Sequence, residues 1–168
     1  MRVGFGYDVH RLVPGRPLIL GGVTIEYPRG LLGHSDADVL LHAICDAMIG
    51  AAALGDIGVH FPDTDPQLRD VSSMVLLGRT MELIARKGFR LKNIDSTIVA
   101  QRPKLSPFIP RMVETISNHL GLEPGSVNIK AKTTETLGFA GREEGIAAYA
   151  VALVEESALR DGEPFVQV

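Results

Sequence analysis

The chain has 168 residues, of which 45% are hydrophobic and 22% charged, and its formal net charge is -3. This length and composition fit one packed domain over residues 1–168. Cys45 is the only cysteine, which excludes an internal disulfide and a cysteine-based zinc cluster, so a transition metal would need His, Asp or Glu ligands. With no leader, no apolar run of bilayer length and no basic block, the sequence favours a soluble, cytoplasmic protein that binds neither membranes nor nucleic acid.

The first segment has the pattern of a β-strand with two different faces. Successive side chains of a strand point to opposite sides. One face therefore carries the bulky apolar residues Val3, Phe5, Tyr7 and Val9, and the other carries Gly4, Gly6, Asp8 and His10. Asp8 and His10 would be two ligands offered to one metal, although for an isolated Asp-x-His an exposed polar strand end is the more common explanation.

Turn and capping signals divide the next part of the chain. Two β-rich runs around a Gly-Gly pair predict a hairpin over residues 17–27. Ser35, with Asp38 three residues later, has the pattern of a capping box and predicts a helix that continues until Gly55. Residues 56–66 are rich in aspartate, proline and glycine, which predicts a polar loop.

The second half of the chain alternates helices and strands. Ser72 or Ser73 would cap a helix that ends at Gly88, and a further helix over residues 109–120 would end at Gly121. Strands are predicted over residues 94–100, 127–132 and 146–154. The last of these strands is apolar on both faces, which implies cover on both sides.

This order of elements predicts an α/β (α+β) sandwich in which helices pack on one face of a mixed β-sheet. In so short a chain, helices can readily cover only one face. We therefore expect the other face to meet sister subunits, because it would otherwise be a large exposed apolar patch.

His42 lies one helical turn from both Asp38 and Asp46, so the three residues form a polar stripe on an otherwise apolar helix. A histidine on such a face is more often a satisfied core residue than a ligand. With Asp8 and His10, however, it completes three protein ligands with one coordination position open, which is typical of catalytic zinc; cobalt or manganese would also suit this set. Asp38 or Asp46 would then orient the imidazole. The hypothesis requires this helix to pack over the glycine face of the first strand.

Three other segments carry groups suited to phosphate or to a nucleotide. His34-Ser35 lies at the predicted helix start, where free N–H groups favour an anion, although a plain helix cap explains Ser35 equally well. Residues 100–106 form a proline-punctuated loop that suits a flat base, with Lys104 available for phosphate. Residues 132–135 offer hydroxyls and a carboxylate for phosphate and Mg²⁺. Ordinary strand ends are the alternative explanation for the last two segments.

Four motifs together resemble the 2-C-methyl-D-erythritol 2,4-cyclodiphosphate synthase family. They are Gly-Tyr-Asp-Val-His-Arg-Leu, Gly-His-Ser-Asp-Ala-Asp-Val-Leu-Leu-His, Phe-Pro-Asp-Thr-Asp-Pro and Thr-Thr-Glu-x-Leu-Gly-Phe-x-Gly-Arg-x-Glu-Gly. The resemblance covers essentially the whole chain. It implies a homotrimer with active sites between neighbouring subunits, and a lyase of the non-mevalonate isoprenoid pathway. Its substrate would be 4-diphosphocytidyl-2-C-methyl-D-erythritol 2-phosphate, and its products the cyclic 2,4-diphosphate and CMP.

The resemblance also implies roles for individual residues. Zn²⁺ would be held by Asp8, His10 and His42, and a Mg²⁺ or Mn²⁺ on the substrate diphosphate would be held by Glu135. The transition state would be stabilised by His34 and Thr133. Contacts with the erythritol part and its phosphate would come from Val9, Ser35, Asp56, Ile57, Gly58, Phe61, Pro62, Asp63, Thr64 and Asp65. Contacts with cytidine and its phosphates would come from Ala100, Gln101, Arg102, Pro103, Lys104, Leu105, Ser106, Lys132 and Thr134, with Phe139 and Arg142 as further substrate contacts.

Two other functions fit parts of the same pattern. A zinc-dependent phosphoester hydrolase would use the same three ligands and open position to activate water. A non-catalytic trimer that binds a prenyl diphosphate in an axial cavity near Arg142 is the second alternative. Release of a linear phosphate with solvent oxygen would identify the hydrolase, and an axial cavity too narrow or too polar for a prenyl chain would exclude the binding protein.

Overall fold

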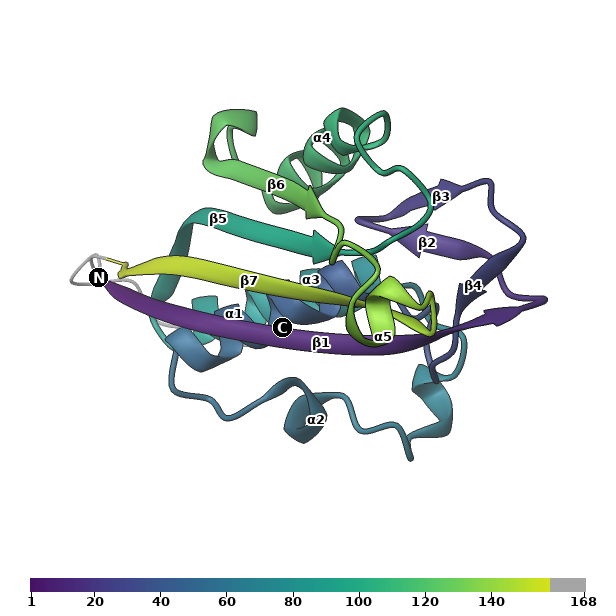
Figure 1. The fold of residues 1–168 in the computed structure, drawn as a ribbon. Coiled ribbons are helices and arrows are strands. Elements are labelled where there is room, and N and C mark those ends of the chain that lie inside the picture. The colour runs from purple at the N-terminus through teal and green to yellow at the C-terminus, as the bar shows by residue number, and fades with distance from the viewer. Residues whose placement is uncertain (158–168) are drawn as a thin grey trace.

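The computed structural model describes residues 1–157, and a mixed five-stranded sheet is its largest element (Figure 1). The strands lie in the order β4-β1-β7-β5-β6. Their bounds are β1 Arg2–Pro14, β4 Arg29–Leu31, β5 Phe89–Val99, β6 Val127–Lys132 and β7 Gly145–Glu156. Only β5 and β6 pair in parallel, and the other neighbours pair antiparallel. The expected mixed sheet is confirmed.

The remaining elements lie around this sheet. The hairpin predicted around the Gly-Gly pair is present as β2 (Leu18–Leu20) and β3 (Val23–Ile25). The helices are α1 (Val39–Ala51), α2 (Ile57–His60), α3 (Ser73–Arg86), α4 (Ile109–Leu120) and α5 (Gly138–Gly141), with short 3₁₀ turns at Pro66–Leu68 and Pro124–Ser126. In Figure 1, α1 and α3 lie together behind the sheet. Within residues 1–157 no helix has both the length and the apolar character needed to cross a membrane.

The central helix α1 is buried on nearly all sides, because it lies between the sheet and α3. It packs so closely on β1 that glycine is required there. A Cβ on Gly6 would lie 2.1 Å from the carbonyl oxygen of Ala43, and one on Gly4 would lie 1.9 Å from that of Ala47. The expectation that the helix packs over the glycine face of the first strand is therefore confirmed.

The other face of the sheet is exposed in the single chain and is strongly apolar. On β1, Val3 and Phe5 are 66% and 63% exposed, and Tyr149 on β7 is 40% exposed. The rings of Phe5 and Tyr149 lie 6.2 Å apart, so the apolar side chains form one continuous surface across two strands. A surface of this kind marks a place of interaction.

The start of α1 corrects the predicted capping box. The helix begins at Val39 and its N-cap is Asp38, whose side chain accepts from the Leu41 amide; it ends at Ala51, before the predicted Gly55. Ala37 has a left-handed backbone with φ 58°, so the helix cannot start at Ser35. The predicted helix start at His34-Ser35 is therefore wrong, because the Asp38 carboxylate occupies that helix end, and a phosphate contact of these two residues stays a prediction that does not rest on the helix.

Asp38 fixes the helix start to the β2–β3 hairpin. The side chain is fully buried and accepts from the amides of Gly21 (3.0 Å) and Gly22 (2.7 Å) as well as from that of Leu41. Burial raises the pKa of Asp38 to about 6, although the three amide donors lower it. The tertiary contact therefore explains why the cap moved from Ser35 to Asp38.

Candidate functional site

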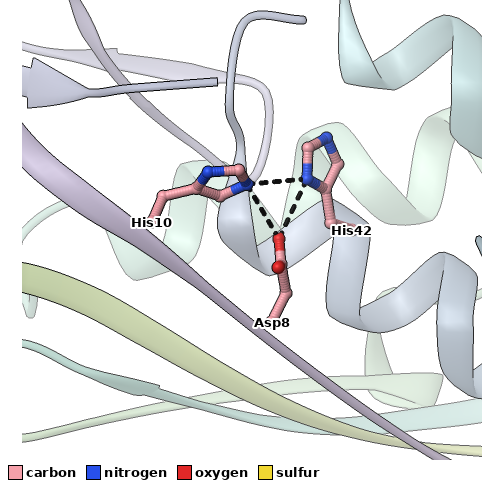
Figure 2. Close-up of side chains that lie close together, drawn as sticks. All are labelled: Asp8, His10 and His42. Atoms are coloured by element: carbon pink, nitrogen blue, oxygen red, sulfur yellow. Dashed lines mark hydrogen bonds and ion pairs between the residues drawn. The ribbon is translucent and has the colours of Figure 1, made fainter. Parts of the chain in front are cut away.

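Asp8, His10 and His42 meet where β1 passes over α1, as Figure 2 shows. Asp8 Oδ2 lies 3.0 Å from His10 Nε2 and 2.9 Å from His42 Nδ1, and the two ring nitrogens are 3.1 Å apart. Asp8 and His10 come from the glycine side of β1, and His42 comes from the facing side of α1. One carboxylate and two imidazoles converging on one point form a donor set suited to a divalent transition metal.

The backbone fixes which nitrogen of His10 faces this point. His10 Nδ1 lies 2.8 Å from the carbonyl oxygen of Leu32. A carbonyl only accepts, so Nδ1 carries a hydrogen, and Nε2 is the nitrogen that faces Asp8 and would give its lone pair to a metal. Such an arrangement is the usual way in which a protein prepares a histidine to bind a metal.

His42 is oriented by serines, and the prediction that Asp38 or Asp46 orients it is wrong. His42 Nε2 lies 2.9 Å from Ser73 Oγ and 3.1 Å from Ser35 Oγ. Asp46 instead accepts from the amide of Ile57 at 3.1 Å. Sequence reasoning missed Ser73 as a functional residue, because it lies 31 positions from His42 and its only sequence signal was that of a helix cap.

The electrostatics of the three side chains favour a cation between them. Burial raises the pKa of the Asp8 carboxyl, but the hydrogen bonds and charges of His10 and His42 outweigh it and hold that pKa well below its usual range. Burial lowers the pKa of His10, but the hydrogen bond and charge of Asp8 raise it above its ordinary value. The carboxylate thus attracts positive charge, which either a proton or a metal ion would supply.

A cavity of about 140 Å³ is lined by two of the three candidate ligands, His10 and His42, and we call it the metal-side cavity. It is lined by His10, His34, Ser35, His42, Ile57, Phe61, Asp63, Leu68 and Leu76. Four of the residues that the resemblance assigns to the erythritol part and its phosphate (Ser35, Ile57, Phe61 and Asp63) are therefore gathered beside the candidate metal centre, together with His34. The predicted loop over 56–66 also contains the short helix α2, which begins at the N-cap Asp56.

His34 is held by the loop on the far side of this cavity. Its Nε2 lies 2.9 Å from the carbonyl oxygen of Asp65 and donates to it. The neutral ring therefore presents the lone pair of Nδ1, and it gains a second N–H donor only as imidazolium. Stabilisation of a transition-state phosphate by His34 stays a prediction, and this geometry specifies that the charged ring would be required.

A second cavity, of about 410 Å³, lies at the ends of β5 and β6, and we call it the strand-end cavity. Its lining is Ala100, Gln101, Arg102, Pro103, Lys104, Leu105, Ser106, Ala131, Lys132 and Thr133. Because β5 and β6 are parallel, both chain segments leave the sheet at the same edge. The structure thus brings together the whole 100–106 loop and the end of β6 that sequence reasoning assigned to a nucleotide.

A strained turn places Glu135 beside this cavity. Glu135 and Thr136 both have left-handed backbones, with φ 51° and 68°, and the amide of Leu137 bonds to the carbonyl of Thr134 at 2.9 Å. These are the features of a type I′ turn, which normally carries Asn-Gly. Glu135 is exposed and accepts from the hydroxyl of Thr133 at 2.6 Å, so its carboxylate lies in the open, where a hard cation can reach it.

The two cavities share no lining residue and lie apart on the sheet. Across neighbouring strands, Asp8 pairs with Ala148, Ala148 with Ile98 and Ile98 with Ala131. Three strand spacings separate Asp8 from Ala131, which is about 14 Å. Phe139 and Arg142 lie on and just after α5, and the Arg142 guanidinium pairs with the exposed Glu144 at 2.9 Å. Their role as substrate contacts stays a prediction.

Comparison with known proteins places this chain among close relatives. It is 66% identical to the 2-C-methyl-D-erythritol 2,4-cyclodiphosphate synthase of Syntrophobacter fumaroxidans over 92% of this chain and 97% of that protein. Among solved structures, a CDP-bound 2C-methyl-D-erythritol-2,4-cyclodiphosphate synthase is 40% identical, with a TM-score of 0.84, over 92% of this chain and all of the other. The bifunctional IspDF of Campylobacter jejuni is 44% identical, with a TM-score of 0.89, over 92% of this chain but only 42% of that longer one. The YgbB family model matches residues 1–155, and the chain belongs to that family.

Proposed function

We propose that the chain converts 4-diphosphocytidyl-2-C-methyl-D-erythritol 2-phosphate into 2-C-methyl-D-erythritol 2,4-cyclodiphosphate and CMP, as a cytoplasmic enzyme of the non-mevalonate isoprenoid pathway. The observation that carries the proposal is the pairing of a small cavity at a three-ligand metal centre with a separate open cavity at the ends of β5 and β6. The relatives bear the name of this reaction, and one related structure is described as bound to CDP. A substrate with a compact phosphorylated sugar at one end and a nucleotide at the other matches two such cavities.

The separation of the cavities supports an active site shared between chains in a homotrimer. Within one chain the two cavities share no residue, and β7 and β5 lie between Asp8 and Ala131. The exposed apolar surface of Val3, Phe5 and Tyr149 offers the contact that would bring a neighbour's strand-end cavity to the metal-side cavity. Phe5→Glu should therefore dissociate the assembly in light scattering and abolish activity, whereas an active monomeric variant would contradict the shared site.

The reaction needs positioning and charge neutralisation more than a strong base. The 2-phosphate oxygen forms a bond to the β-phosphorus, the bond from that phosphorus to the bridging oxygen breaks, and this oxygen leaves on CMP. The second pKa of a phosphate monoester is about 6, so the nucleophile is mostly anionic at neutral pH. Holding the two ends of one substrate together is worth roughly 7 to 11 kcal/mol when the geometry is good.

The side chains around the metal-side cavity fit this requirement. Ser35 and His34 border the cavity as hydrogen-bonding groups for phosphate oxygens, and Asp63 lies where it would receive hydroxyls of the erythritol part. Zn²⁺ would be held by Asp8, His10 and His42, and a bound divalent metal supplies Lewis-acid stabilisation of charge on phosphate oxygens.

At the strand-end cavity, the 100–106 loop would enclose the cytosine base. Thr133, Thr134 and Lys132 would receive its phosphates. Glu135 would hold Mg²⁺ or Mn²⁺ with the diphosphate, because exposed carboxylate oxygens are preferred ligands of these ions. Thr133 would have to exchange its hydrogen bond with Glu135 for one to the transferring phosphate, which makes this pair the adjustable part of the cavity.

The deciding experiment supplies the cytidyl substrate with Mg²⁺ and follows CMP and the cyclic product by mass spectrometry in ¹⁸O-labelled water. We expect a cyclic diphosphate without solvent oxygen. A linear phosphate that contains ¹⁸O would identify the zinc hydrolase that the same three ligands also permit. Absence of both products from the folded, metal-loaded protein would overturn the proposal.

A prenyl diphosphate in a cavity on the threefold axis would be an accessory ligand of the same trimer. Phe5, Tyr7 and Tyr149 give the exposed face the apolar character that a prenyl chain requires, and Arg142 would meet its diphosphate. Calorimetric titration of the trimer with geranyl diphosphate should show binding that Arg142→Ala weakens. Equal binding by both proteins would contradict this assignment.

A further inference from the structure

The proposed metal centre requires His42 to present the lone pair of Nδ1, and this depends on what Nε2 does. A neutral imidazole carries one hydrogen, so Nδ1 is free only when Nε2 holds it. The two partners of Nε2, Ser73 Oγ at 2.9 Å and Ser35 Oγ at 3.1 Å, are hydroxyls. Because a hydroxyl can either donate or accept, these contacts alone allow both tautomers. On the other side of the ring, Asp8 Oδ2 lies 2.9 Å from Nδ1 and only accepts, so a metal that binds Nδ1 must displace any hydrogen held there.

Asp36 removes this ambiguity. Its Oδ1 accepts the hydroxyl hydrogen of Ser73, and its Oδ2 accepts from the Ser73 amide at 2.9 Å. A carboxylate has no hydrogen to give, so the single hydrogen of the Ser73 hydroxyl is committed to Asp36. The Ser73 oxygen can then only accept, and the hydrogen between it and His42 must belong to Nε2.

We infer that Asp36 and Ser73 are positioning residues that hold a hydrogen on His42 Nε2, so that Nδ1 is the nitrogen left to bind a metal. The chain of hydrogen bonds begins at Asp36, in the loop before α1, passes through Ser73, at the start of α3, and ends at His42 in the middle of α1. Ser73 is fully buried, which protects this chain of hydrogen bonds from exchange with water. The inference rests on the proposed metal centre, and it adds the two residues that prepare His42 to bind the metal.

Helix capping is the competing explanation for the same contacts. Asp36 receives an N–H from the first turn of α3, which by itself would stabilise that helix. The two explanations differ at the neighbouring Ser72, which is the N-cap of α3 and accepts from the Met74 amide at 3.3 Å. Ser72→Ala removes a cap without touching His42, and it is therefore the matched control for Ser73→Ala.

The first measurement is the Zn²⁺ affinity of the full chain, by competition with a chromogenic chelator. Loss of an outer partner of a metal-bound histidine typically weakens metal binding by about 10- to 100-fold. We expect Ser73→Ala to bind Zn²⁺ at least about tenfold more weakly, with Ser72→Ala unchanged. In Asp36→Asn, the side-chain oxygen can still accept from the Ser73 amide, and the side-chain NH₂ group then donates to Ser73 Oγ. The hydroxyl hydrogen of Ser73 is thereby free to donate to His42. This variant should also bind Zn²⁺ at least about tenfold more weakly.

The second measurement observes the Nε2 hydrogen directly and needs no variant. In the ¹⁵N-histidine spectrum of the Zn²⁺-loaded wild-type protein, the Nε2–H of His42 should exchange slowly with water, because it donates to the buried Ser73 oxygen. A rapidly exchanging Nε2–H would overturn the inference even if a variant failed to fold. Equal Zn²⁺ affinity of folded Ser73→Ala and wild type would also overturn it, and would leave the metal centre intact. A wild-type chain that binds no Zn²⁺ would instead reject the metal centre itself.

Discussion

The metal-side cavity and the strand-end cavity are built by different parts of the fold. At the first, Asp8, His10 and His42 come from the core contact between β1 and α1, and each histidine has a second partner that fixes its ring. At the second, most of the lining belongs to a loop, and Glu135 is held by one short turn. The comparison teaches that the core can fix the candidate metal ligands in advance, whereas the strand-end cavity keeps exposed groups whose positions a loop and a turn can adjust.

The largest expected effect is at the metal centre. His42→Ala removes one of three ligands, and we expect kcat/KM to fall about 10³-fold, because a Lewis acid contributes several kcal/mol to such a reaction. Zn²⁺ affinity should fall with it. His119→Ala replaces an exposed histidine at the end of α4 and should change neither quantity. An active His42→Ala variant would mean that catalysis does not take place at the metal-side cavity.

The dependence of the metal centre on the core is tested at two glycines. Gly6→Ala would drive a methyl group into the Ala43 carbonyl, and we expect it to lower the free energy of unfolding by about 3 kcal/mol and to weaken Zn²⁺ binding. Gly50→Ala, on an open side of α1, should raise the same free energy by about 0.5 to 1 kcal/mol, because alanine favours helix. Denaturant titrations measure both. Equal stability of the two variants would show that β1 and α1 are not locked together.

The strand-end cavity should respond in a graded way. Glu135→Gln keeps the shape of the side chain but removes its charge, so we expect kcat/KM to fall about 30-fold at limiting Mg²⁺ and to recover partly as Mg²⁺ rises. Steady-state assays across a range of Mg²⁺ concentrations test this, with Glu114→Gln on α4 as the control. A loss independent of Mg²⁺ would assign Glu135 to another task.

The smallest effect concerns Asp38, which fixes the start of α1. Burial raises the pKa of Asp38 from 3.8 to about 6. The folded chain therefore holds this proton more tightly than the unfolded chain, and the group favours folding at low pH and ceases to do so as pH rises past about 6. Between about pH 4 and 7 this lowers the free energy of unfolding by about 2 kcal/mol, and Asp38→Asn should lack that fall. An unchanged pH dependence of urea unfolding in the variant would refute this.

The elements and ligands that obey local rules were predictable from sequence. Alternation along residues 3–10 placed Asp8 and His10 on the glycine face, and helical spacing brought His42 over them, as the structure confirms. The α4 boundaries, with Gly121 in the left-handed conformation at the C-terminal end, also follow local signals. The mixed sheet follows from the order of the elements.

What could not be predicted depends on partners distant in sequence. Asp38 caps the helix in place of Ser35 because its carboxylate also accepts from the amides of Gly21 and Gly22. Nothing in the sequence near Ser35 indicates these contacts. Ser73 and Asp36 are 37 positions apart and meet only because α3 packs beside the loop that precedes α1. The short β4 and α5 lack any periodic pattern, so sequence reasoning did not find them.

At the turn of Glu135 and Thr136, the residues that would make the chain most stable differ from those that its proposed activity requires. A chain selected for stability alone would place Asn-Gly at two successive left-handed positions, and relief of that backbone strain would be worth about 1 to 3 kcal/mol per residue. Such an exchange would make the protein more heat-resistant and remove the carboxylate proposed to hold Mg²⁺. Attempts to stabilise this enzyme by consensus turn chemistry should therefore leave these two residues unchanged.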